Sequence, residues 1–185
     1  MLLVVDETTL RLLAPLRAAW ALRGQQAQVP LSGRNDQRVL FGALGRGQRP
    51  TPAVAPRPGV RRRTSRRSLR HLRQRHYRAG QPLWLLLDRA SCHVAASSLA
   101  LAAQLDITLL WLARQCSELN AMDHLWRHLK ADLAANRQRP DIDPLAEQAE
   151  AWTLALSPQQ SLRKAGWLSK GCWLKNVRTN FWPPT

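Results

Sequence analysis

Residues 83–88 read LWLLLD, an unbroken apolar run that ends on the acidic residue Asp88. A continuous apolar run of this length is typical of a central strand that is covered on both faces. Residues 2–5, LLVV, form a second run of this kind, and Asp6 and Glu7 follow it directly. The sequence therefore predicts two buried strands, each with a carboxylate at its C-terminal end.

Outward from these two runs, strand and helix patterns alternate. Residues 38–44, RVLFGAL, predict a strand that can pair antiparallel with the first one, and residues 107–112 predict another strand. Residues 94–104 are rich in alanine and leucine and predict a helix. Ser117 is a good N-cap for a helix from 118 to about 135, and Asp143-Pro144 and Ser157-Pro158 predict the starts of two short C-terminal helices. This order favours a mixed α/β fold with carboxylates gathered at one end of the central strands.

The chain is strongly basic, with a formal net charge of +16 and a sequence pI of about 11.6. Nine arginines lie between Arg61 and Arg78, and Leu69, Leu72 and Tyr77 recur there at helical spacing, which predicts a basic helix ending near Gly80. Such a charge indicates a polyanionic partner, with nucleic acid the first candidate. A basic surface that only keeps the protein soluble is the alternative.

Residues 45–63 are rich in proline and arginine and lack alternating apolar residues. Proline removes a hydrogen-bond donor from a strand ladder, so we expect a loop here and a missing or irregular edge strand. We interpret this stretch as a degraded or frame-shifted remnant of a strand, and a disordered basic loop that touches DNA is the alternative. The tail, residues 169–185, shows no periodicity.

The cysteines Cys92, Cys116 and Cys172 are widely separated and form no CxxC pair, so neither a disulfide framework nor a zinc ribbon is indicated. The longest apolar stretches, residues 83–87 and 107–112, are too short to span a bilayer. We therefore expect an intracellular protein without a membrane segment.

Three acidic residues come from three different predicted elements: Asp6 and Asp88 after strands, and Asp123 in the first turns of a helix. Hard divalent cations such as Mg²⁺ prefer oxygen ligands, and three clustered carboxylates can hold two such ions. A two-ion site is the recurring solution for displacement at phosphorus. Each aspartate taken alone is more often a turn or N-cap residue.

The order of these motifs resembles a known family. Residues 85–93 read LLLDRASCH, residues 117–126 read SELNAMDHLW, and 34 residues separate Asp88 from Asp123. This block is similar to the catalytic block of the mariner-like DDE/DDD transposase superfamily, including its bacterial insertion-sequence members. The resemblance extends from residue 2 to about 173 and implies an RNase H-like mixed sheet flanked by helices. Arg89 stands where family members usually have asparagine.

Residue by residue, the resemblance implies that Asp6, Asp88 and Asp123 are the catalytic metal ligands, for Mg²⁺ or Mn²⁺ and two ions. Many relatives have glutamate at the third position, and the shorter Asp123 must approach more closely or act through a water. Glu118 is a weaker rival for that role. We also predict DNA contacts from Arg66, Arg67, Arg70, Arg89 and His93, although His93 can equally be a buried structural histidine. His124 and His128 have zinc-compatible spacing, but an outer helix face is the preferred interpretation.

We expect a catalytic domain at 1–136 with the basic insert at 45–63, C-terminal helices of the same domain at 137–168, and a tail at 169–185. The family's helix-turn-helix modules are not expected in this chain, which favours an N-terminally truncated protein or one with a separate end-recognising partner. The implied function is metal-dependent DNA cleavage and strand transfer in DNA transposition, by a homo-oligomer in the bacterial cytoplasm at the nucleoid. An inactive remnant with nonspecific DNA binding and a general RNase H-like nuclease are the alternatives.

Overall fold

The computed structural model describes residues 1–13, 15–30, 33–54, 61–76 and 81–174. These residues form a five-stranded sheet in the order β3-β2-β1-β4-β5. The strands are β1 (Leu2–Arg11), β2 (Gln37–Gly45), β3 (Thr51–Val54), β4 (Leu83–Leu87) and β5 (Ile107–Trp111). Strands β1, β2 and β3 pair antiparallel, whereas β4 runs parallel to both β1 and β5. The sheet is therefore mixed, as expected.

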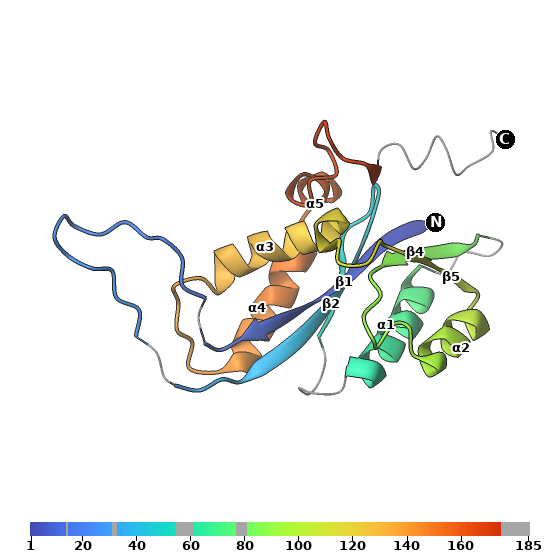
Figure 1. Cartoon of the computed structure of the whole chain (residues 1–185), viewed down its shortest axis with the longest axis horizontal. Helices are drawn as coiled ribbons and strands as arrows, with labels where there is room; N and C mark the ends of the chain where they lie inside the picture. Colours follow the sequence, from blue (N-terminus) through green and yellow to red (C-terminus); the bar gives the residue numbers. More distant parts are fainter. Residues whose placement is uncertain (14, 31–32, 55–60, 77–80, 175–185) are drawn as a thin grey trace.

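Helices cover both faces of this sheet (Figure 1). They are α1 (Arg61–Arg75), α2 (Ala96–Gln104), α3 (Ala121–Leu133), α4 (Ile142–Ala155) and α5 (Pro158–Lys164), and a 3₁₀ turn, η1 (Ser117–Leu119), precedes α3. Side chains alternate across a strand, so Leu3 and Val5 of β1 pack with α1 and α2, and Val4 packs with α3, α4 and α5. One sheet thus separates two hydrophobic cores.

The expectation of a missing edge strand was wrong. Strand β3 lies within the proline-rich segment and pairs with β2 through the partners Gly42 with Pro52 and Ala43 with Thr51, among others. Because β3 is the outermost strand, Pro52 is tolerated there, where only one neighbour needs hydrogen bonds. The strand is four residues long, too short for an alternating pattern to be visible in the sequence.

Strand β1 is longer than predicted. It continues through Asp6 and Glu7 to Arg11, pairing with β2 along its length, so Asp6 is not at a strand end. The paired neighbour on its other side stops earlier, because the last partners of β1 and β4 are Val4 and Leu86. Asp6 therefore lies within a strand but at the point where the parallel part of the sheet ends.

Two predicted helix starts were shifted. The N-cap of α3 is Asn120 rather than Ser117, which instead begins the 3₁₀ turn. The N-cap of α4 is Asp141 rather than Asp143, and Pro144 is accommodated in the first turn, where backbone N–H groups have no helical partner. The predicted Ser157 cap of α5 is confirmed, with a capping box to Gln160. Helix α1 ends at Arg75, and Tyr77 and Gly80 lie outside the described residues.

Gly42 of β2 is the point where helix α3 approaches the sheet most tightly. A Cβ atom at Gly42 would lie 2.5 Å from Cζ2 of Trp126 and 2.6 Å from the terminal methyl of Met122. Both side chains are almost completely buried. Gly42 is also the cross-strand partner of Asp6, so this contact sets the height of α3 above the strand that carries the first aspartate.

Across the described residues, the longest apolar helical stretch falls short of what a bilayer crossing requires.

We expect Gly42→Ala to destabilise the protein by about 1–3 kcal/mol, because the added methyl group overpacks a rigid core contact. Gly171→Ala is the matched control, since a Cβ there meets nothing within 4 Å and its φ is not left-handed. Urea denaturation of both variants measures the difference. Equal stabilities of the two variants would contradict the proposed close approach.

Candidate active site

Asp6 and Asp88 are brought together by the parallel pairing of β1 with β4. Asp88 immediately follows the last residue of β4, and the register that joins Val4 to Leu86 points Asp6 and Asp88 toward the same end of the two strands. The Asp88 side chain is 48% exposed, and its Oδ1 accepts a hydrogen bond from the backbone N–H of Ala90 at 3.1 Å. This turn holds the carboxylate at the open end of the sheet.

Asp123 is in the first turn of α3, on the face of the sheet that Val4 shares. The start of this helix is fixed by Asn120, whose side-chain oxygen accepts from the N–H of Met122 at 3.0 Å and whose amide nitrogen donates to the carbonyl of Val5 at 3.1 Å. Asn120 is buried. Asn120 therefore anchors the turn before Asp123 to the residue before Asp6.

The three aspartates influence one another electrostatically. Burial raises the pKa of Asp6 to about 7, a hydrogen bond from the Glu7 backbone opposes this, and the charges of Asp88, Asp123 and Glu7 raise it further. The oxygens of Asp6, Asp88 and Asp123 do not all lie within 4.8 Å of one another. The carboxylates thus share one crowded, negatively charged region without meeting at a single point.

Two cationic side chains of α3 partly balance this charge. Nη2 of Arg127 lies 2.6 Å from Oδ2 of Asp123, an i,i+4 ion pair on the helix surface. Lys130 is half-buried, and its pKa is lowered by burial although the charges of Asp123 and Asp6 act in the opposite direction. Lys130 was not predicted as a site residue. The spacing of Asp123, Arg127 and Lys130 along one helix face was the signal that could have found it.

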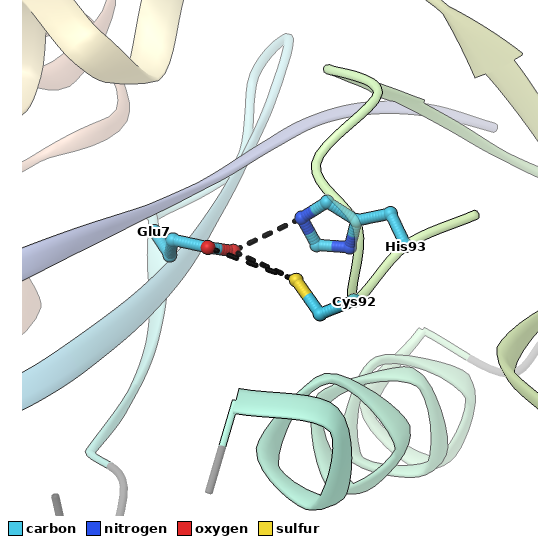
Figure 2. Close-up of side chains that lie close together, drawn as sticks. All are labelled: Glu7, Cys92 and His93. Carbon is cyan, nitrogen blue, oxygen red and sulfur yellow. Dashed lines mark hydrogen bonds and ion pairs between the residues drawn. The ribbon is translucent and has the colours of Figure 1, made fainter. Parts of the chain in front are cut away.

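Glu7, Cys92 and His93 form a second cluster of side chains that lie close together (Figure 2). Nε2 of His93 is 3.0 Å from Oε2 of Glu7 and 3.7 Å from Oδ1 of Asp88. Burial lowers the pKa of His93, but hydrogen bonding with Cys92 and Glu7 outweighs it and raises that pKa to about 10. His93 is therefore protonated at neutral pH and forms an ion pair with Glu7. Neither Glu7 nor Cys92 was predicted as a site residue.

The residues predicted to contact DNA have different exposures. Arg67, Arg70 and Arg89 are exposed, Arg66 is half-buried, and His93 is buried. The buried Oγ of Ser65 on α1 lies 3.3 Å from Nδ1 of His93, so α1 passes close to the Asp88 end of the sheet.

Three side chains considered above as alternative metal ligands lie in the 3₁₀ turn before α3 or on α3 itself. Glu118 is exposed in the 3₁₀ turn. Nε2 of His124 forms a hydrogen bond with the carbonyl oxygen of Glu118 at 3.1 Å, and His128 is exposed on the helix. The preferred interpretation of the two histidines as an outer helix face agrees with these positions.

The comparisons with known proteins agree with this arrangement. The sequence profile of a family described as DDE superfamily endonuclease matches residues 1–146. No curated protein sequence matches significantly. Among solved structures, the mariner Mos1 paired-end complex with Mg is 17% identical with a TM-score of 0.73, and the match covers 96% of this chain and 55% of that chain.

Two further structures describe the same protein in other states. The Mos1 paired-end complex with the left transposon end is 17% identical with a TM-score of 0.70, covering 96% of this chain and 55% of that chain. The catalytic domain of Mos1 mariner transposase is 14% identical with a TM-score of 0.67, covering 96% of this chain and 81% of that chain. The chain therefore spans about half the length of the paired-end transposases and has the RNase H-like fold of their catalytic domain. By its sequence, it belongs to the DDE superfamily of endonucleases.

Proposed function

We propose that this chain is the catalytic domain of a mariner-like DNA transposase, which cleaves DNA phosphodiesters and joins the freed 3′ ends to target DNA. The observation that carries the proposal is the crowding of Asp6, Asp88 and Asp123 at the C-terminal end of β4, where each charge raises the pKa of Asp6. Carboxylates gathered at strand ends are placed where ligands bind in open α/β sheets. Because the chain resembles transposases, we propose DNA as the substrate of this site.

The three aspartates fit divalent metal ions of the Mg²⁺ class. All three offer only oxygen donors, and a nearby cation would relieve the repulsion on the half-buried carboxylate of Asp6. Two ions are proposed because a two-ion site is the recurring arrangement for displacement at phosphorus. When bound, such ions activate an attacking hydroxyl and neutralise charge on the leaving oxygen. Complexes of Mos1 with Mg and with Mn are among the similar structures.

The protein side chains have separate tasks in this proposal. The ions are held by Asp6, Asp88 and Asp123. Before the ions bind, the negative charge of this region is partly neutralised by Arg127 and Lys130. Exposed Arg89, beside Asp88, and Arg67 and Arg70 on α1 would hold phosphates through charge-assisted hydrogen bonds. Buried His93 would orient Asp88 rather than touch DNA.

The partners and setting follow from the same proposal. A net charge of +16 suits DNA, and transposition requires two DNA ends, so a homo-oligomer on DNA is proposed. We propose a helix-turn-helix module as the part that recognises the element ends. A bacterial insertion-sequence origin and a nucleoid location complete the proposal.

A second candidate is an inactive remnant that only binds DNA. The observation that favours it is the short Asp123, whose Oδ2 lies 2.6 Å from Nη2 of Arg127. If this ion pair persisted, Asp123 would not reach an ion. The two candidates differ in whether DNA is cut, and strand joining separates a transposase from a general nuclease.

Nicking of supercoiled plasmid DNA in Mg²⁺ tests the proposal directly. We expect Asp88→Asn to lower the nicking rate by about 100-fold or more, because a lost metal ligand removes several kcal/mol of charge stabilisation. Asp106→Asn is the matched control, since Asp106 is exposed in the turn before β5 and its left-handed φ suits asparagine. Unchanged nicking by the Asp88 variant would reject the site, and no nicking by the wild type would favour the remnant.

The raised pKa of Asp6 predicts the pH dependence of stability without metal. A carboxyl whose folded pKa, about 7, exceeds its unfolded value of 3.8 makes the protein less stable as pH rises between those values. Asp6→Asn should therefore be more stable than the wild type at pH 8, on the order of 2–4 kcal/mol, and the difference should shrink at pH 4. Urea denaturation in the presence of a metal chelator measures this difference in the free energy of unfolding.

The same variant also reports on metal binding. Mg²⁺ should stabilise the wild type more than Asp6→Asn, since the ion binds the native carboxylates. A difference between the two proteins that is the same at both pH values would contradict the electrostatic account of Asp6.

A further inference from the structure

We propose that Glu7, Cys92 and His93 form a second metal site, for a borderline transition-metal ion such as Zn²⁺, on the opposite side of β1 from the Asp6 side chain. Glu7 and Asp6 are adjacent in an extended strand, so their side chains point to opposite faces. The site is thus distinct from the three aspartates, and it does not depend on the proposed nuclease function.

The spacing of the three donor atoms suits tetrahedral coordination. With zinc bonds of about 2.0–2.3 Å to nitrogen, oxygen and sulfur, neighbouring ligand atoms lie roughly 3.4–3.6 Å apart. In the protein, Nε2 of His93 lies 3.0 Å from Oε2 of Glu7. Sγ of Cys92 lies 3.7 Å from Oε1 and 3.9 Å from Oε2 of Glu7, and all three donors are within 4.8 Å. Shifts of about half an ångström would therefore complete three of the four ligand positions.

Two of the three donors are buried, Glu7 is half-buried, and neighbouring residues hold the loop that carries Cys92 and His93 in place. Cys92 is 2% exposed and His93 is 6% exposed. Ser98 Oγ donates to the carbonyl of Cys92 at 2.7 Å, which fixes the loop after β4. Ser65 Oγ lies 3.3 Å from Nδ1 of His93 and can accept its proton, which leaves Nε2 directed at Glu7. A hydrogen bond on the second ring nitrogen is the usual support of a metal-binding histidine.

The donor set selects the class of ion. One thiolate, one imidazole and one carboxylate suit Zn²⁺ and its neighbours, whereas Mg²⁺ prefers oxygen ligands alone. A water can complete the fourth position, and Oδ1 of Asp88 lies 3.7 Å from Nε2 of His93, so the two sites are neighbours without sharing a ligand. Without an ion, Glu7 and His93 form the ion pair described above, and the Cys92 thiol contacts both of them.

Co²⁺, a coloured substitute for Zn²⁺, tests the site in the full chain. Titration in excess Mg²⁺ occupies the aspartates with the hard ion, and a thiolate-to-cobalt charge-transfer absorption then reports sulfur ligation. We expect this absorption to saturate at a single ion per chain. It should be lost in Cys92→Ser and retained in Cys116→Ser and Cys172→Ser, which change the other two thiols.

Two further variants separate ligation from folding. Ser65→Ala should keep the absorption but weaken Co²⁺ affinity by about 10–100-fold, as loss of a supporting hydrogen bond does. Asp6→Asn should leave it unchanged, because Asp6 is on the other face. If Cys92→Ser does not fold by circular dichroism, Glu7→Gln replaces it and should weaken binding. No charge-transfer absorption in the folded wild type, or absorption that persists in Cys92→Ser, overturns the proposal.

Discussion

The side-chain amide of Asn120 is the contact on which the geometry of the active site depends. Its oxygen caps α3 at Met122 and its nitrogen binds the carbonyl of Val5, so one buried group ties the helix that carries Asp123 to the strand that carries Asp6. Leaving either group unpaired in the interior would cost about 1–3 kcal/mol. Gly42 of β2 supports the same geometry as Asn120. Only a residue without a side chain lets α3 lie so close to β2.

This close approach has an electrostatic cost. A half-buried Asp6 with three acidic neighbours is less stable ionised than it would be in water, and its raised pKa reflects that cost. Arg127 compensates Asp123 at the surface, where an ion pair contributes little. The region therefore holds unfavourable charge that bound cations would relieve, as expected at a functional site.

Much of the fold was visible in the sequence because its signals are local. A strand that is covered on both faces is enough to explain each apolar run before Asp6 and Asp88. Both predicted strands are present in the structure, as β1 and β4. Strand β3 was missed because its place at the edge, which is a property of the whole sheet, is what makes Pro52 acceptable. The full length of β1 was missed for a similar reason, since pairing with β2 extends it through polar residues that carry no apolar pattern.

The residues of the candidate site were likewise predicted only in part. The three aspartates were predicted from motif spacing, and the structure gathers their charges in one region, whereas their role as ligands stays a prediction. Glu7 and Cys92 gave no signal, because a glutamate beside a predicted ligand and a lone cysteine become neighbours only when the sheet forms. Because side chains alternate along β1, Glu7 points away from Asp6. The turn after Asp88 brings Cys92 and His93 close to Glu7. The pairing of β1 with β4 that gathers the aspartates on one face thus assembles a thiol, an imidazole and a carboxylate on the other.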